Sequence, residues 1–227
     1  MKSISKNKIV LILGILALIF TGAVSARKFN HLLQVKSFKK SHATNTVELK
    51  TGDIIFQSSV SPQCKAIQLA THSEYSHCGM IIKNNDACYV LEAVQPVRYT
   101  PYDQWIARGK GGHFAIRRLK NAEQVLTNDV VEKMKQAGKS FEGKNYDIYF
   151  NWSDENIYCS ELVWKVYKQS TGLEIGKLEK LKDFDLSSKI VQQTLNERYG
   201  KQVPYNDLVI SPASIFRSEL LTTVILK

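Results

Sequence analysis

Apolar and polar residues between positions 49 and 119 follow the patterns of short β-strands separated by turns. Clusters of turn-forming residues, such as Thr51-Gly52-Asp53 and Asn84-Asn85-Asp86, divide the apolar segments. We predict strands at residues 53–57, 77–83, 88–94, 97–100 and 113–119. Two helical segments are expected between them, at residues 62–71 with Pro62 in the first turn, and at residues 101–106.

The second half of the chain has the spacing of helices. Residues 122–139 carry apolar side chains on one helical face, and Gly138 is the expected end of that helix. A loop at 143–153 leads into a second helix, which begins at Cys159. A loop at 207–212 and a strand at 220–226 close the chain. This order predicts an α+β fold with a mostly antiparallel sheet packed against the helix that carries Cys159.

The first 26 residues differ from the rest of the chain. Three lysines precede an uncharged apolar run at residues 9–20, and small residues follow up to Ala26. This is the pattern of a secretory signal peptide. Twelve apolar residues are fewer than the roughly 20 that usually span a bilayer. We therefore expect export and cleavage after Ala26, and an uncleaved N-terminal anchor is the alternative.

The remainder divides into a polar, basic tether at residues 27–46 and a domain at residues 47–227. Within the domain, residues 173–200 are rich in charged side chains and read as a polar insertion, which could cap a cleft and alter the substrate. Loss of the three lysines of the signal peptide lowers the net charge from +10 to +7. A basic surface suits an anionic membrane or cell-wall polymer, or it is simply solvated. The export signal argues against nucleic acid as a partner.

Cys159 is the first candidate for chemistry. It stands just before the apolar stripe of Leu162, Val163, Val166 and Tyr167, where the first helical turn begins. The positive end of a helix dipole stabilises an anion, so a thiol at this place loses its proton more easily. A thiolate is the nucleophile of cysteine hydrolases. The alternative is that Cys159 is a small buried hydrophobic residue.

His77 and Glu92 are the candidates for the base and for the group that orients it. His77 opens a strand, and Glu92 lies between apolar residues on the next strand, where an unpaired carboxylate is costly. Pairing of the two strands about Asn84-Asn85 places His77 opposite Glu92. Taken singly, each residue could also be an ordinary strand histidine or a surface glutamate.

A metal site is a competing hypothesis. Cys64, His72, His77 and Cys78 fall within 15 residues. Their spacing matches no regular zinc signature, and the adjacent His77 and Cys78 should face opposite sides of a strand. We therefore expect neither a metal nor another cofactor.

Four motifs in order resemble the YiiX-like permuted papain-fold enzymes, which are relatives of the NlpC-type cell-wall peptidases. They are Gly52-Asp53-Ile54-Ile55-Phe56, Tyr75-Ser76-His77-Cys78-Gly79-Met80, Leu91-Glu92-Ala93 and Tyr158-Cys159-Ser160-Glu161-Leu162-Val163. Histidine precedes cysteine, as a circular permutation of the papain-like fold requires. The resemblance covers roughly residues 49–214 of the chain.

The resemblance implies that Cys159 is the nucleophile, His77 the base and Glu92 the orienting carboxylate. It implies hydrolysis of an amide bond in a peptide, muropeptide or acyl-amide of the cell envelope. Tyr158 and Tyr75 are further candidates for contact with substrate, although aromatic packing is the other use of both. Two other functions stay open, namely a lipid acyltransferase or phospholipase and a papain-like module that binds a ligand without turnover.

Overall fold

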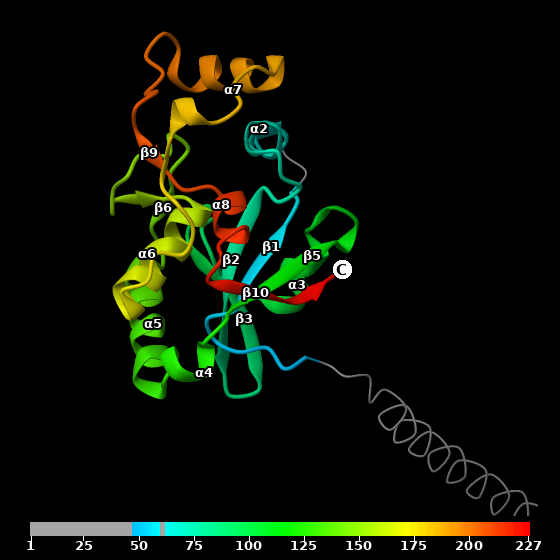
Figure 1. Cartoon of the computed structure of the whole chain (residues 1–227), viewed down its shortest axis with the longest axis vertical. Helices are drawn as coiled ribbons and strands as arrows, with labels where there is room; N and C mark the ends of the chain where they lie inside the picture. The colour runs from blue at the N-terminus through cyan, green and yellow to red at the C-terminus, as the bar shows by residue number, and fades with distance from the viewer. Residues whose placement is uncertain (1–46, 60–61) are drawn as a thin grey trace, which may run out of the picture. The chain divides into compact units, whose positions relative to one another are not determined.

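The computed structural model describes residues 47–59 and 62–227 of the chain, and Figure 1 shows how their helices and strands are arranged. The predicted signal peptide and tether lie outside the described residues. In the described part of the chain, no helix is both long enough and apolar enough to cross a membrane.

The centre of the fold is a six-stranded sheet in the order β10-β5-β1-β2-β3-β4, in which every neighbouring pair is antiparallel. The strands are β1 (Ile54–Gln57), β2 (His77–Asn84), β3 (Ala87–Glu92), β4 (Arg98–Pro101), β5 (Phe114–Leu119) and β10 (Leu221–Leu226). All six predicted strands are therefore present, with ends that differ by one or two residues. The predicted α+β fold with an antiparallel sheet is confirmed.

Alternate residues of the strands face two separate apolar clusters, as the period of a strand requires. Ile54 and Phe56 pack in the larger cluster, beneath α5 (Asn128–Phe141) and α6 (Cys159–Thr171). Ile55 packs on the opposite face, where Trp105 of α3 (Tyr102–Ala107) is fully buried. The sheet is thus covered by the cysteine-bearing helix on one face and by a short helix on the other.

Two further helices lie at the end of the domain drawn at the top of Figure 1. There α7 (Lys189–Tyr199), from the predicted polar insertion, packs against α2 (Pro62–Thr71). Short elements complete the chain: α4 (Ala122–Val125), α8 (Pro212–Phe216), the pair β6 (Asn145–Tyr146) and β7 (Asn156–Ile157), the pair β8 (Glu179–Lys180) and β9 (Leu208–Val209), and 3-10 turns at Lys110–Gly112 and Leu181–Asp183. The insertion is ordered helix and strand.

The prediction of one helix that ends at Gly138 is wrong. Residues 122–139 belong to two helices, because the Thr127 hydroxyl accepts a hydrogen bond from the Val130 N–H and so starts a new helix. Gly138 lies inside α5, which continues to Phe141. A Cβ at Gly138 would come within 2.6 Å of Leu91 and 3.0 Å of Tyr99, so this glycine permits close packing on the sheet.

Residues 212–216 form a helix, α8, where the sequence predicts no element, and the predicted loop at 207–212 contains strand β9. Ser211 caps α8 by accepting a hydrogen bond from the Ser214 N–H at 3.0 Å, and Pro212 is the first helical residue. Serine followed by proline is a known start signal for a helix. The short length of α8, only five residues, gave no periodic pattern to accompany that signal.

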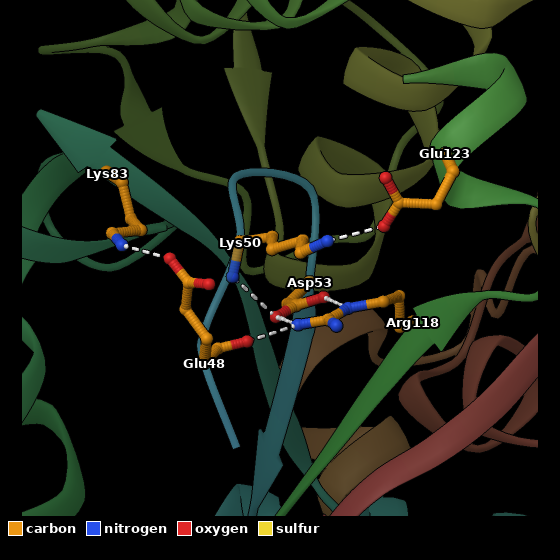
Figure 2. Close-up of polar contacts among 6 residues, drawn as sticks. All are labelled: Glu48, Lys50, Asp53, Lys83, Arg118 and Glu123. Atoms are coloured by element: carbon orange, nitrogen blue, oxygen red, sulfur yellow. Dashed lines mark hydrogen bonds and ion pairs between the residues drawn. The ribbon is translucent and has the colours of Figure 1, made fainter. Parts of the chain in front are cut away.

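A network of charged residues fixes the beginning of the domain, as Figure 2 shows. The Asp53 carboxylate is only 1% exposed and accepts two hydrogen bonds from Arg118 of β5, at 2.6 and 2.7 Å. The Lys50 N–H donates to the same carboxylate at 2.8 Å, and Arg118 also donates to the Glu48 carbonyl. The first residues before β1 are thereby held against the middle of the sheet.

Candidate active site

The nucleophile candidate Cys159 is the first residue of α6, and Tyr158 is its N-cap. The Glu161 carboxylate accepts a hydrogen bond from the Tyr158 N–H at 3.4 Å, which secures the first turn. Glu161 in turn pairs with Lys165 at 2.8 Å, one turn further along the helix. The sulfur of Cys159 therefore has the position at a helix start that the sequence predicted, where N–H groups and the helix dipole favour an anion.

The structure brings His77 and Glu92 into direct contact. His77 Nε2 lies 2.7 Å from Glu92 Oε2. The predicted register is wrong by two residues, because Met80 pairs with Leu91 where the prediction placed it opposite Tyr89. A shift of two residues keeps every side chain on its predicted face, so the His77–Glu92 contact survives as a diagonal pair.

Gly79 makes room for this diagonal contact. It follows His77 on the same face of β2, since strand faces repeat every two residues. A Cβ at Gly79 would lie 2.8 Å from the Leu91 carbonyl oxygen and 3.4 Å from the Glu92 Cβ. The absence of a side chain there lets the Glu92 carboxylate approach the imidazole.

Glu92 is fully buried, and four side chains satisfy its carboxylate. Thr100 donates to Oε1 at 2.5 Å, Trp105 Nε1 donates to Oε2 at 2.9 Å, and Arg108 forms an ion pair with Oε1. Burial alone would raise the pKa of Glu92, but the hydrogen bonds and charges of His77, Thr100 and Arg108 outweigh it and lower the pKa to about 2. The group is therefore a fixed anion at neutral pH.

His77 connects this anion to the cysteine. Burial disfavours the imidazolium, but hydrogen bonds to Cys159 and to Glu92 outweigh it and raise the pKa of His77 to about 10. Because Nε2 faces Glu92, Nδ1 is left for the sulfur. The imidazole also stacks on the indole of Trp105 at 5.9 Å between ring centroids, which fixes its plane. The arrangement favours an imidazolium beside a thiolate.

A second cysteine belongs to this site. Cys78 faces the α6 side of the sheet, and its thiol is hydrogen-bonded to Cys159. The pKa of Cys159 lies well below the ordinary thiol value because of the hydrogen bond from Cys78 and, against the cost of burial, the hydrogen bond and charge of His77. Burial raises the pKa of Cys78 well above its ordinary value, and the hydrogen bond and charge of Cys159 raise it further. Cys78 therefore stays the proton donor of the pair.

The two tyrosine candidates have different places. Tyr158 lies beside Cys159 in the wall of a cavity, where its hydroxyl accepts a hydrogen bond from the Ile210 N–H at 3.1 Å. Tyr75 packs between Phe56 and Phe216, with ring centroids at 5.9 and 4.5 Å, and does not line that cavity. The structure therefore brings Tyr158 to the candidate site and places Tyr75 in the core.

The cavity beside Cys159 has a volume of about 100 Å³. It lies between α2, α7 and the start of α6, so the predicted insertion supplies one of its walls. Most of the side chains that line it are apolar, including Ile67, Phe184, Leu186, Val191, Leu195 and Val209. A substrate group that enters it leaves water for an apolar surface.

With this geometry in hand, the comparisons with known proteins identify the family. A family model described as permuted papain-like amidase enzymes, YaeF/YiiX, matches residues 48–225. The chain belongs to this family. It is accordingly a cysteine hydrolase of amide bonds with a permuted papain-like fold, as the four sequence motifs suggested.

Two relatives from Escherichia coli resemble the chain closely. The uncharacterized protein YiiX of strain K12 is 52% identical over 175 residues, which cover 77% of this chain and 85% of that protein. A crystal structure of the metalloprotein YiiX from Escherichia coli O157:H7 is 50% identical, has a TM-score of 0.75, and covers 78% of this chain and 97% of that one.

The competing hypothesis from the sequence is a metal site formed by Cys64, His72, His77 and Cys78. Among the residues that the structure describes, no three His, Cys, Asp or Glu side chains are arranged to hold a metal ion. In particular, His72 is paired with Asp185 at 3.1 Å, whereas His77 is paired with Glu92. Within the described residues, those of the metal hypothesis thus do not form one donor set.

Sequence reasoning missed the residues that support the site. Thr100, Trp105 and Arg108 hold Glu92, and they come from β4, α3 and the residue after α3. No motif spacing links them to Glu92, because the contacts depend on how α3 crosses the sheet. Cys78 was placed correctly on the face opposite His77, but its approach to Cys159 follows only from the packing of α6 on β2.

Proposed function

We propose that this amidase is an exported enzyme of the cell envelope that hydrolyses an acyl-amide through a Cys159–His77–Glu92 triad. The observation that carries the proposal is the unbroken chain of contacts from the buried Glu92 carboxylate, through the imidazole, to a sulfur at the start of a helix. A nucleophile, a base and an orienting group in this sequence of contacts define thiol hydrolases.

In the first step, the Cys159 thiolate attacks the carbonyl carbon of the amide. The oxygen becomes an oxyanion, which the Cys159 backbone N–H at the helix start is placed to stabilise. When the tetrahedral intermediate collapses, the C–N bond breaks and the His77 imidazolium donates its proton to the departing nitrogen. The acyl group remains on the sulfur as a thioester, and the amine leaves.

In the second step, neutral His77 takes a proton from water as the oxygen of that water attacks the thioester carbonyl. The C–S bond then breaks, the carboxylic acid leaves, and the thiolate–imidazolium pair is restored. Glu92 keeps the proton-bearing Nε2 in place during both steps, because Thr100, Trp105 and Arg108 fix its carboxylate.

The lining of the cavity supports an acyl-amide over a muropeptide among the amides considered. A sugar-peptide would present many hydroxyl and amide groups to a mostly apolar wall with few polar partners for them, whereas an acyl chain carries no such groups. The same lining favours acyl transfer to or from a lipid as a second candidate. Product analysis separates them: a hydrolase releases a free acid in water, and a transferase makes product only when an acyl acceptor is added.

Export is part of the proposal and rests on residues 1–26, with their basic start, apolar run and small residues before position 27. The basic composition fits an anionic membrane or cell-wall surface as a neighbour. Cell fractionation, together with N-terminal sequencing of the isolated protein, tests this part. A full-length N-terminus in the cytoplasmic fraction would refute export, and a full-length N-terminus in the membrane fraction would indicate an uncleaved anchor.

The triad is tested first by the pH dependence of iodoacetamide labelling at Cys159, read by peptide mass. We expect rapid labelling near neutral pH, and a shift of the profile upward by a unit or more in His77→Ala. Cys159→Ala should abolish turnover of acyl-amides while the fold is retained. Slow labelling below about pH 8 that is unaffected by His77→Ala would match an ordinary thiol and would favour a binding module without turnover.

A further inference from the structure

The lining of the mostly apolar cavity beside Cys159 includes one cationic side chain, which comes from α7. Arg198 lines the cavity, and its guanidinium lies 4.6 Å from the centroid of the Phe150 ring. It is also hydrogen-bonded to the Tyr199 side chain. The planar guanidinium is therefore held by an aromatic face and a hydroxyl, at the wall of the space that the substrate enters.

Arg198 has no acidic partner among the residues described. The salt bridges of that part of the chain join other pairs, and the neighbouring Glu197 instead accepts a hydrogen bond from Gln193 at 2.7 Å. Of the four buried carboxylates described, Asp53, Glu92 and Glu161 each have a cationic partner, and Asp147 accepts hydrogen bonds from two backbone N–H groups. Arg198 is half-buried, so its guanidinium keeps donors that an anionic group in the cavity can reach.

Tyr146 lies close to both Arg198 and the candidate nucleophile Cys159, which line the same cavity. The Tyr146 hydroxyl lines the same cavity, accepts a hydrogen bond from Gln63 at 3.2 Å, and experiences the charges of both Cys159 and Arg198. Tyr146 thus links the sulfur to the guanidinium within one cavity. A ligand that reaches from Cys159 along the apolar wall can place an anionic group at Arg198.

We infer that Arg198 is a specificity-determining residue that binds an anionic group of the substrate, either a carboxylate or a phosphate. The substrate is then an amphipathic acyl-amide with an apolar portion in the cavity and an anion at α7. Guanidinium groups bind both kinds of anion through paired hydrogen bonds, so the geometry names their shared chemistry. This inference rests on the proposed function, because it assigns the substrate of the same site.

The test measures how octanoate, octyl phosphate and octanol protect Cys159 from iodoacetamide, which is itself uncharged. We expect the two anions to give half-maximal protection at concentrations about ten-fold lower than octanol, the size of effect typical of a hydrogen bond to a charged group. Arg198→Gln should abolish this difference, and Arg198→Lys should keep part of it. Lys189→Gln removes the same charge from an exposed position at the other end of α7, and it should leave the preference for anions over octanol unchanged.

The possible outcomes of this test are distinguishable. Preference for octanoate alone or for octyl phosphate alone supports the inference and identifies the anion. Equal protection by all three compounds in the native protein, or an anion preference that persists in Arg198→Gln, overturns it. Thermal unfolding of each variant shows whether the fold is retained.

A failure of the proposed function gives a different result. In that case Cys159 reacts slowly even without a ligand, whereas a failure of the Arg198 inference leaves the reaction fast and removes only the anion preference. Calorimetric titration of the same three compounds into Cys159→Ala protein reads the preference without the thiol. Tighter binding of an anion than of octanol, lost in the Cys159→Ala/Arg198→Gln double variant, supports the inference, and equal binding overturns it.

Discussion

The Cys78 thiol donates a hydrogen bond to the sulfur of Cys159, and Cys78 directly follows His77 in β2. Two consecutive residues of β2 therefore reach the same sulfur from the two faces of the strand. His77 does so around the strand end, and Cys78 does so from beneath α6. Both contacts lower the pKa of Cys159 and so favour its thiolate. The proposed triad includes only one of these two residues, His77.

Replacement of Cys78 by alanine should raise the pKa of Cys159, since the thiolate then loses a hydrogen-bond donor. At neutral pH the thiolate fraction would fall, and the pH profile of iodoacetamide labelling at Cys159 should move upward. Cys88→Ala is the matched control, because it removes a half-buried thiol elsewhere on the sheet. A profile that is identical in Cys78→Ala and the native protein would show that the contact contributes nothing to the thiolate.

Glu92→Gln should shift the alkaline limit of activity downward. The Glu92 carboxylate helps to raise the pKa of His77 to about 10, so activity that needs the imidazolium is expected to fall as pH rises toward 10 in the native enzyme. A neutral amide would lower the pKa of His77 and move this fall to lower pH. The loss in kcat should be smaller than in His77→Ala, which removes proton transfer worth about 10²–10⁴-fold.

The same pair makes folding stability depend on pH. The pKa of Glu92 falls from 4.5 to about 2, so its contribution is present above pH 4.5 and is lost as pH falls toward 2. The pKa of His77 rises from 6.5 to about 10, so its contribution is complete below pH 6.5 and is lost as pH rises toward 10. Urea midpoints of the native protein minus those of Glu92→Gln should therefore be largest between pH 4.5 and 6.5, and a constant difference would contradict this.

Gly79→Ala should move Glu92 away from His77 without removing either side chain. The added Cβ would lie 2.4 Å from the Val90 Cγ1 and 2.8 Å from the Leu91 carbonyl oxygen, so β3 must move away from β2. We expect a loss in kcat and a lower pKa of His77, measured by the pH profile. Gly143→Ala is a comparison for backbone strain away from the site, because its φ of 82° disfavours alanine although a Cβ there meets nothing within 4 Å. An unchanged profile in Gly79→Ala would show that the diagonal contact tolerates the displacement.

Arg118→Met should destabilise the domain without altering the chemistry of the thiol. It leaves the buried Asp53 carboxylate without its bidentate partner (Figure 2), and breaking a buried ion pair in this way costs about 3–5 kcal/mol. Urea unfolding measures the loss, and the labelling profile of Cys159 should stay the same. Glu123→Gln is the comparison, because its ion pair with Lys50 is exposed and should matter little.

The sequence predicted those parts of the fold that local pattern determines. The strands and α2 were recognisable because apolar residues recur at the strand or helix period between turn residues. The face of Glu92 was also predictable, since a register error of two residues leaves it unchanged. That is why the contact between His77 and Glu92 could be anticipated from an incorrect register.

What the sequence did not predict depends on how the elements pack. Gly138 resembles a helix terminator by residue type, and only the approach of Leu91 and Tyr99 explains its place inside α5. The groups around Glu92 and the donor Cys78 are likewise set by the crossing of α3 and α6 over the sheet. The cavity arises where α2 meets α7, two elements more than a hundred residues apart in the chain.

The separate origins of the cavity wall and the triad have a consequence for how such enzymes diversify. The proposed triad comes from β2, β3 and the start of α6, whereas a wall of the cavity comes from a single later stretch that includes α7. Substitutions in that stretch can change which molecules are admitted while the strands keep the reacting groups in register. Selection for a new substrate can therefore act on a part of the gene that does not encode the catalytic geometry.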